Sequence, residues 1–390
     1  MLTSSARILT THTGSLPRPP ALAEALVARE NGELSPQGAA ALPGMVGSAI
    51  AEVLRRQVEA GLDVVSDGEM GKIGYSTYVK ERMSGFDGEA GALALADLED
   101  YPEFTERALA GLVTATPACT GPVAYTGEAA LAADLEAVRA GVEAAGVDLS
   151  TAEVFVPAAS PGVISLFLAD QFYGDQEAYL AALAEAMRVE YEAIAAAGFL
   201  VQIDCPDLAM GRHAQYAHLS VAEFRTKVAL HVEALDHALR GIDPGRLRMH
   251  LCWGNYEGPH HHDVDLADIV DIVLRARPRG LVLEAANPRH GHEWQVFETV
   301  TLPEDKVLVP GVIDTSSNYI EHPDLVAQRI GRYAEIVGAE RVIAGTDCGF
   351  STFASFLPVS PRIAWAKLAS LVEGAARASA RLRAPALPAR

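Results

Sequence analysis

The sequence has few cysteines, few aromatic residues and no long hydrophobic segment. Only 6% of the 390 residues are Phe, Trp or Tyr, and the four cysteines, Cys119, Cys205, Cys252 and Cys348, lie far apart. Their spacing gives no sign of a disulfide framework. No stretch approaches the roughly 18 consecutive apolar residues of a membrane-spanning helix, and the N-terminus shows no signal-peptide pattern. We therefore expect a cytoplasmic protein whose thiols are buried, catalytic or metal-bound.

Basic residues are also in short supply. The chain has 31 Lys and Arg against 51 Asp and Glu, which gives a formal net charge of −20. This excess of negative charge repels phosphate backbones and anionic lipid headgroups, so the composition argues against nucleic acid or a membrane as partner. The 49% hydrophobic and 21% charged residues are otherwise those of an ordinary globular protein.

Short apolar runs alternate with longer amphipathic or alanine-rich segments. Helices are predicted in the ranges Val46–Ala60, Gln176–Ala197, Val221–Arg240, Leu266–Arg277 and Pro323–Val337. Nine runs have strand character: ILTTHTG, LDVVSDGE, GPVAYTG, EVFVPAAS, FLVQIDCP, RLRMHLCWG, GLVLEAAN, KVLVPGVID and RVIAGTDCG. The alternation of strand and helix predicts an α/β fold with a parallel sheet.

Nine candidate strands are enough to close an eight-stranded (β/α)8 (TIM) barrel, with one run left outside it. We therefore expect a single barrel domain over residues 1–390. Residues 83–115 interrupt the rhythm with the acidic, glycine-rich stretch FDGEAGALALADLEDYPEF, which we interpret as an insertion that caps the barrel. A doubly wound open sheet is the alternative, but no GxGxxG motif follows the first run.

Several apolar runs end in a polar or reactive residue. Four such residues can bind a metal: His250 and Cys252 in MHLCWGN, Glu284 in LVLEAAN, and Cys348 in AGTDCGF. Strand residues two apart point to the same face, and the C-terminal ends of barrel strands meet at one mouth. A single buried Cys or His is more often structural, but two thiolates, an imidazole and a carboxylate together suit Zn²⁺. We therefore expect a zinc site.

This ligand set also indicates a type of chemistry. Two cysteines and a glutamate place three negative charges on a divalent ion, which makes the ion a poor Lewis acid for hydrolysis. Such an ion instead keeps a substrate thiol as an electron-rich thiolate that can attack carbon. Glu284 is the weakest of the four ligands and the one expected to yield its place to the substrate sulfur. The pattern therefore favours thiol alkylation over water activation.

These motifs resemble the cobalamin-independent methionine synthase family, specifically its catalytic C-terminal barrel. The resemblance covers nearly the whole chain and rests on THTGSLPRP, DVVSDGEMGK, VQIDCPDL, MHLCWGN, LVLEAAN, VPGVIDTSSNYIEHP and AGTDCGF. It implies that the catalytic zinc is bound by His250, Cys252, Glu284 and Cys348.

The same resemblance implies substrate contacts. Gly14 and Ser15 match the family's Gly-Ser after the first strand, which contacts the amino-acid thiol. Glu69 and Asp204 match two carboxylates that hold the amino group of homocysteine. From the residues alone, these two carboxylates could equally be solvated strand ends or helix caps, although a cationic substrate does need carboxylates at the barrel mouth.

The chain departs from the family pattern in two ways. The full-length enzymes have two barrels and this chain has room for one, so the domain that helps with folate is missing and the methyl donor need not be a methyl-folate. Where the family has Asp-Ile-His-Ser, with a His that acts as acid toward the donor, this chain places Thr315 at or beside the His. Threonine cannot supply a proton near neutral pH, so Thr315 implies different leaving-group chemistry.

Shorter, single-barrel relatives suggest two reactions. Some resemble methionine synthases that take methyl from a corrinoid, and others resemble epoxyalkane:coenzyme M transferase, in which a zinc thiolate opens an epoxide. Our main hypothesis is a zinc-dependent transferase in which Glu69, Asp204 and Thr315 assist alkylation of homocysteine or a related thiol by a methyl-folate or methyl-corrinoid. Epoxide opening by a thiol is the alternative.

Two hypotheses come from other classes of protein. One is a metal-free enzyme of the uroporphyrinogen decarboxylase fold, which would not need His250, Cys252 and Cys348 together. The other is a non-catalytic zinc barrel that binds thiols, since four protein ligands can also mark a structural site. In each case the chain is compatible with a homo-oligomer.

Overall fold

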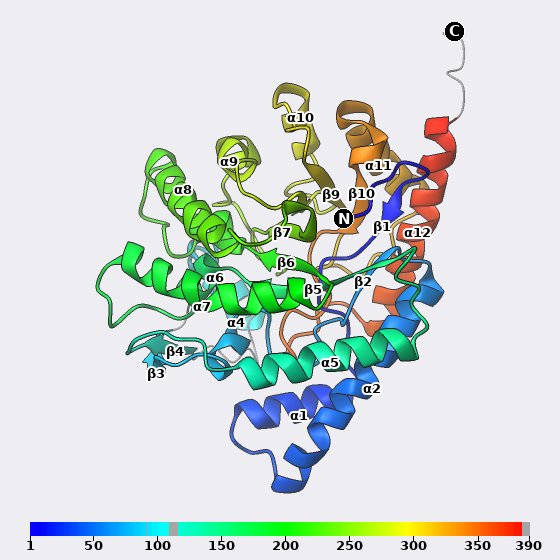
Figure 1. Ribbon diagram of the computed structural model, residues 1–390. Helices are drawn as coiled ribbons and strands as arrows, with labels where there is room; N and C mark the ends of the chain where they lie inside the picture. Colours follow the sequence, from blue (N-terminus) through cyan, green and yellow to red (C-terminus); the bar gives the residue numbers. More distant parts are fainter. Residues whose placement is uncertain (92, 109–115, 384–390) are drawn as a thin grey trace.

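The computed structural model describes residues 1–91, 93–108 and 116–383. Eight parallel strands form one sheet that curves into a barrel, and helices surround it (Figure 1). The strands pair in the order β1-β10-β9-β8-β7-β6-β5-β2, which confirms the predicted (β/α)8 architecture. Their bounds are β1 (Leu9–Thr10), β2 (Val64–Ser66), β5 (Glu153–Ala159), β6 (Leu200–Asp204), β7 (Leu247–Leu251), β8 (Gly280–Leu283), β9 (Val307–Ile313) and β10 (Ile343–Thr346).

The two strands at the ends of this order, β1 and β2, are joined by single hydrogen bonds. The Asp63 amide donates to the Thr10 carbonyl at 3.1 Å, and the Thr11 hydroxyl donates to the Val64 carbonyl at 3.0 Å. These bonds draw the edges together, so the barrel is nearly closed. Strands β6 to β10 are buried at every position, which explains why they read as continuous apolar runs.

The predicted helices are present with small shifts at their ends. The exception is the first, which begins at Pro36 and not at Val46 because Ser35 caps it by accepting from the Gly38 amide and Pro43 is tolerated inside it. The helices are α1 (Pro20–Glu30), α2 (Pro36–Ala60), α3 (Ala96–Glu99), α4 (Pro102–Ala108), α5 (Glu128–Ala144), α6 (Pro161–Phe167), α7 (Gln176–Ala196), α8 (Val221–Ala238), α9 (Leu266–Val273), α10 (Val296–Thr299), α11 (Pro323–Val337) and α12 (Pro361–Arg383).

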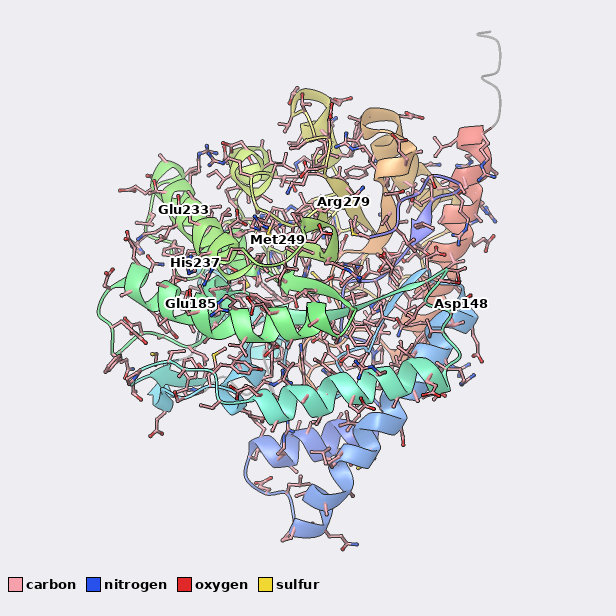
Figure 2. The ribbon with its side chains drawn as sticks, viewed as in Figure 1. Asp148, Glu185, Glu233, His237, Met249 and Arg279 are labelled. Atoms are coloured by element: carbon pink, nitrogen blue, oxygen red, sulfur yellow. The ribbon has the colours of Figure 1, made fainter. Side chains whose placement is uncertain are left out.

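Short 3₁₀ turns complete several of the loops between strands and helices. They are η1 (Thr77–Glu81), η2 (Pro206–Leu208), η3 (Met210–Arg212), η4 (Pro244–Arg246), η5 (Glu293–Gln295) and η6 (Ala339–Arg341). The outer helices contact one another through polar side chains, as Glu185 on α7 and His237 on α8 do (Figure 2). No helix within the described ranges is both long enough and apolar enough to cross a membrane.

The ninth strand-like run, GPVAYTG, forms no barrel strand and lies outside, as expected for one of the nine. The insertion contains β3 (Phe86–Ala90), α3 and α4, and β3 pairs antiparallel with β4 (Thr116–Cys119), which directly follows the insertion. Residues 92 and 109–115 of the predicted insertion lie outside the described part. The Ala96 amide donates to the His213 carbonyl, and Asp97 accepts from the Tyr256 hydroxyl, so the insertion packs on the loops after β6 and β7. The insertion therefore lies beside the C-terminal ends of the barrel strands.

Candidate metal centre and substrate pocket

A pocket opens at the C-terminal ends of the barrel strands. This is the end at which (β/α)8 barrels carry their active sites. Its lining combines thiols, an imidazole, carboxylates and hydroxyls, and comprises Thr13, Ser15, Glu69, Tyr75, Asp204, Pro206, His250, Cys252, Asn255, Cys348, Gly349 and Thr352. Most of the residues selected from the sequence therefore face one space.

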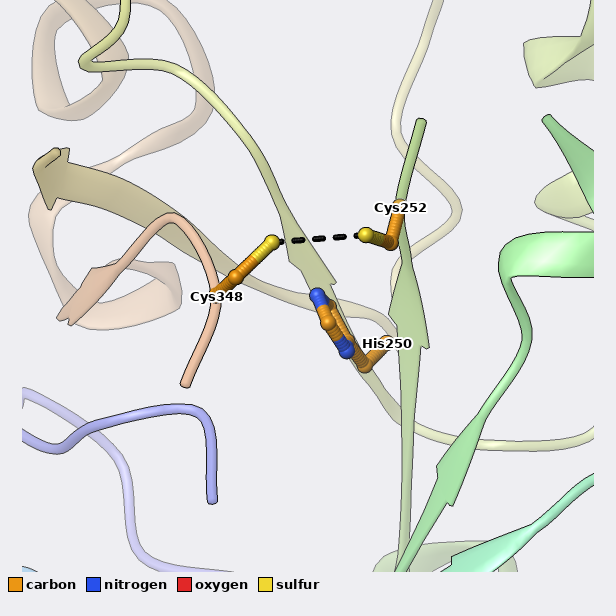
Figure 3. A group of neighbouring side chains, drawn as sticks. All are labelled: His250, Cys252 and Cys348. Atoms are coloured by element: carbon orange, nitrogen blue, oxygen red, sulfur yellow. Dashed lines mark hydrogen bonds between the residues drawn. The ribbon is translucent and has the colours of Figure 1, made fainter. Parts of the chain in front are cut away.

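Three of the four predicted metal ligands meet in this pocket. His250 lies on β7, Cys252 follows the end of β7, and Cys348 follows the end of β10. Their donor atoms all lie within 4.8 Å of one another, and the two Sγ atoms are 3.3 Å apart (Figure 3). A tetrahedral zinc with Zn–S bonds of about 2.3 Å separates its ligand atoms by roughly 3.8 Å, so a small inward or outward shift would accommodate the ion. The other two cysteines are buried elsewhere.

The His250 ring is oriented by a neighbouring carboxylate. Its Nδ1 lies 3.2 Å from Asp204 Oδ1, while its Nε2 is buried and has no hydrogen-bond partner among the described residues. Figure 3 shows one ring nitrogen turned toward the two sulfur atoms. An imidazole anchored at one nitrogen by a carboxylate and free at the other is the usual arrangement of a metal-binding histidine. The orphaned nitrogen and the two thiols therefore fit zinc.

The electrostatics of the cluster also favour a cation. The Cys348 thiol hydrogen-bonds to Cys252 and lowers the pKa of Cys252 to about 7, while burial and the same bond raise the pKa of Cys348 well above its usual value. Burial alone would lower the pKa of His250, but the hydrogen bond to Asp204 and the nearby Cys252 thiol raise it to about 10. Cys348 and His250 thus hold protons at the place where a cation would bind, and a metal ion would replace these protons.

Glu284, the fourth predicted ligand, directly follows β8 but is not part of this group. Its Oε1 accepts from the Trp253 amide at 2.9 Å, and its Oε2 accepts from Asn287 Nδ2 and Arg289 Nη2, each at 2.7 Å. Although burial disfavours the charged form, Arg289 and its neighbours hold the pKa of Glu284 below its usual range. The carboxylate is therefore an ionised neighbour of the cluster with partners of its own.

The predicted substrate carboxylates, Glu69 and Asp204, line the same pocket as the three thiol and imidazole groups. Asp204 ends β6, and Glu69 follows β2 in a left-handed conformation with φ of 57°, which is strained for a non-glycine residue. Glu69 Oε2 is buried and has no hydrogen-bond partner among the described residues. Burial raises the pKa of Glu69 to about 7. The negative charge of Asp204 raises this pKa further, and the nearby cations Lys72 and Arg18 offset the increase only in part. Two carboxylates with an open hydrogen-bonding position suit a cationic group such as an ammonium.

The Gly14–Ser15 turn supports this wall. Ser15 lines the pocket, and its Oγ accepts from the Ser351 amide at 3.3 Å. A Cβ atom added at Gly14 would lie 2.4 Å from Glu69 Oε1. Gly14 is therefore needed for the close approach of the Glu69 carboxylate, and its role in the pocket is indirect.

Thr315 does not line the pocket but contacts a residue that does. Its hydroxyl donates to Asn255 Oδ1 at 3.1 Å, and Asn255 in turn donates to the Gly349 carbonyl and to the Thr352 hydroxyl. Asn255, Thr352 and Tyr75 line the pocket, whereas Thr315 does not. Asn255 and Thr352 were not selected from the sequence, although each follows a metal-ligand motif by three or four residues.

Comparisons with known proteins agree with this geometry. The model of the cobalamin-independent synthase catalytic domain matches residues 167–356. Among curated proteins, a methionine synthase of Thermococcus kodakarensis is 27% identical over 93% of this chain and 90% of its own length. A 2-hydroxypropyl-CoM lyase of Xanthobacter autotrophicus is 28% identical over 84% of this chain and 83% of its own.

A solved structure supports the fold. A B12-independent methionine synthase from Shewanella sp. W3-18-1, in complex with selenomethionine, superposes with a TM-score of 0.72 at 20% identity. The superposition covers 97% of this chain and 99% of that one. The barrel fold of this chain therefore has a solved counterpart of the same architecture.

Proposed function

Because the chain belongs to the cobalamin-independent methionine synthase family, we propose that it is a zinc-dependent transferase that alkylates a small amino-acid thiol, with methyl transfer to homocysteine or a related thiol as its reaction. One observation carries the proposal. His250, Cys252 and Cys348 converge on the same pocket that Glu69 and Asp204 also line. A thiol donor set and two carboxylates suited to an ammonium share one pocket.

Each group has a role that follows from its surroundings. Zinc bound by His250, Cys252 and Cys348 would supply stabilisation of the acceptor thiol in its deprotonated form at neutral pH. Glu69 and Asp204 bind the substrate ammonium, because Glu69 Oε2 is a buried carboxylate oxygen without a hydrogen-bond partner and gains from a cation. Asp204 also holds the His250 ring in place through Nδ1. The acceptor is thereby fixed at both ends, which directs its sulfur to the donor.

The acidic wall helps to choose between thiols. The lyase relative supports epoxide opening by coenzyme M as a second candidate, and Thr315 in place of a histidine is compatible with it. Coenzyme M, however, carries a sulfonate and no amine. Glu69 and Asp204 would repel a sulfonate, so the pocket favours an amino-acid thiol over an anionic one.

Alternatives from other classes receive less support. A metal-free decarboxylase gives no reason for two thiols and an orphaned imidazole nitrogen to converge. A non-catalytic zinc site needs no adjoining pocket with an unpaired carboxylate oxygen such as Glu69 Oε2, and structural zinc sites are closed by four protein ligands.

Metal analysis and a substrate screen test the proposal. The purified chain should contain about one zinc, and C252S should lose both the metal and at least about a thousandfold of the alkyl-transfer rate. C119S, which changes a buried cysteine outside the cluster, is the matched control and should keep the metal. Products of homocysteine, or of coenzyme M with an epoxide, can be read by mass spectrometry. Full activity in a zinc-free preparation would refute the proposal, and conversion of coenzyme M alone would favour the second candidate.

A further inference from the structure

The pocket has carboxylates and thiols in its lining but no basic side chain. Among the residues that the structure describes, no Lys or Arg lines it. The two cations that act on Glu69 are turned to backbone oxygens: Arg18 donates to the Glu69 and Lys72 carbonyls at 2.8 and 2.9 Å, and Lys72 Nζ donates to the Pro157 carbonyl at 2.5 Å. The pocket is therefore acidic and offers little to an anionic ligand.

Binding of the proposed acceptor does not remove this excess of negative charge. Two thiolates balance a divalent zinc ion, and the acceptor ammonium balances one of the two carboxylates in the lining. The other carboxylate remains, and the acceptor adds its own thiolate and carboxylate. Because charges interact strongly where water is scarce, a second substrate that carries a positive charge is favoured in the remaining space.

An aromatic ring belongs to the same lining. Tyr75, in the loop after β2, packs against Phe353 with ring centroids 5.8 Å apart and against Phe167 with centroids 5.9 Å apart. Burial, and then the charges of Cys252 and Asp204, raise the pKa of the Tyr75 phenol well above its usual value, as expected for a ring beside the metal cluster. The face of such a neutral ring attracts cations.

The protein's own cations use a different ring. Lys72 Nζ lies 4.2 Å and the Arg82 guanidinium 4.8 Å from the ring centroid of Tyr78. Over Tyr75, no Lys or Arg of the described residues is found. The ring that faces the pocket is thus left for a cation from outside the protein.

The pocket also lacks a free acid for a leaving group. Thr315 lies outside the lining and donates to Asn255, and the two carboxylates are engaged by the acceptor ammonium. The remaining hydroxyls of the described lining do not give up a proton near neutral pH; they belong to Thr13, Ser15 and Thr352. A methyl group on an amine nitrogen leaves an anion behind unless the nitrogen is protonated. A methyl group on a positively charged sulfur leaves a neutral sulfide and needs no proton.

We propose that the methyl donor is a small sulfonium compound, which binds with its positive charge between the Tyr75 ring and the acidic groups of the pocket. The inference rests on the proposed function and names its second substrate. In the transfer, the acceptor thiolate forms a bond to the methyl carbon, and the electron pair of the broken carbon–sulfur bond stays on the leaving sulfide. The positive charge of the donor and the negative charge of the thiolate disappear together.

A pair of unreactive probes tests the charge preference without any turnover. Choline carries a trimethylammonium group, and in dimethylbutanol a carbon atom replaces its nitrogen, so that the shape is kept and the charge is lost. Titration calorimetry on the zinc-loaded chain, saturated with homocysteine, should show choline binding about tenfold more tightly than dimethylbutanol. Equal affinities for the two probes would overturn the inference.

Variants of Tyr75 assign this preference to the ring. Y75L should reduce the preference for choline to about threefold, because only the acidic groups remain, whereas Y75F keeps the ring and should retain the preference of the wild type. Y319L, which changes an exposed tyrosine outside the lining, is the control and should leave it unchanged. An unchanged preference in a folded Y75L would overturn the place given to the ring, and a loss in Y75F would mean that the hydroxyl binds the probe.

Transfer itself separates the inference from the proposed function. With trimethylsulfonium and homocysteine, the wild type should form methionine and dimethyl sulfide in equal amounts, read by mass spectrometry, and Y75L should lower kcat/KM for the sulfonium about tenfold. Methylation of homocysteine by methylcobalamin or a methyl-folate, but not by trimethylsulfonium, would overturn the inference and leave the proposed function intact. A zinc-loaded chain that alkylates no thiol with any of these donors would remove both.

Discussion

Two buried glutamates, Glu69 in the lining of the pocket and Glu284 outside that lining, illustrate how neighbours decide what a carboxylate does. Both follow a barrel strand and both are almost fully buried. Burial and the nearby Asp204 raise the pKa of Glu69 to about 7, whereas Arg289 holds the pKa of Glu284 below its usual range. Glu284 is paired by the protein, and Glu69 has an oxygen without a partner. An unpaired buried carboxylate is costly, so Glu69 is the one that a ligand is expected to complete.

Of the changes considered in this section, neutralising Glu69 should have the largest effect on substrate binding. In E69Q the substrate ammonium loses a charge-assisted hydrogen bond of about 1.5–3 kcal/mol, which corresponds to roughly a 10- to 150-fold rise in KM for homocysteine. Steady-state kinetics would measure it. A thiol analogue that lacks the amino group is the control and should show almost no change in KM. An equal loss with that analogue would place Glu69 outside ammonium recognition.

The pH dependence of KM for homocysteine should show directly whether the ionised Glu69 carboxylate binds the substrate. Because the pKa of Glu69 is raised to about 7, its carboxylate is mostly protonated at pH 6 and mostly ionised at pH 8. Affinity for the ammonium should therefore rise with pH through this window and be lost as pH falls below 7. The ratio of KM in E69Q to KM in wild type should grow roughly tenfold between pH 6 and pH 8. Taking this ratio removes the titration of the thiol itself, and a flat ratio would contradict the assignment.

Much of this wall, and of the metal cluster, was predictable from the sequence. Parallel strands of a barrel end at one mouth, so residues at the ends of apolar runs, such as His250, Cys252 and Asp204, had to face a common space. The eight barrel strands themselves read as apolar runs because they are covered on both faces. Strand-end position is thus a strong predictor, since it needs only the order of the elements.

Loop geometry was less accessible. The pairing of Glu284 with Arg289 depends on the path of five residues after β8, and that path is set by Asp347, which accepts from the backbone amides of Ala285, Ala286 and Asn287. No local pattern encodes such a long-range contact. For the same reason the sequence placed Thr315 at the reacting centre, while the structure puts Asn255 between Thr315 and the pocket.

A smaller effect is expected from crowding the Glu69 wall without changing its charge. In G14A the new Cβ would lie 2.4 Å from Glu69 Oε1 and must displace the carboxylate. KM for homocysteine should rise by about three- to tenfold, since the ammonium partner is shifted but not lost. G44A is the matched control, because a Cβ there meets no atom within 4 Å. If G14A also raised KM in the E69Q background, the glycine would act on something other than Glu69.

The smallest effect is expected at Thr315, which does not line the pocket and contacts it through Asn255. T315V keeps the shape of the side chain and removes one neutral hydrogen bond to Asn255, which is still held by the Gly349 carbonyl and the Thr352 hydroxyl. A net loss of about 0.5–1.5 kcal/mol limits the fall in kcat/KM to roughly tenfold or less. N255A removes a side chain that lines the pocket and should cost more than T315V. If T315V instead lowered kcat by more than a hundredfold with KM unchanged, the Thr315 hydroxyl would act directly on the leaving group. Thr315 would then take part in the reaction itself, and its hydrogen bond to Asn255 would not be its main role.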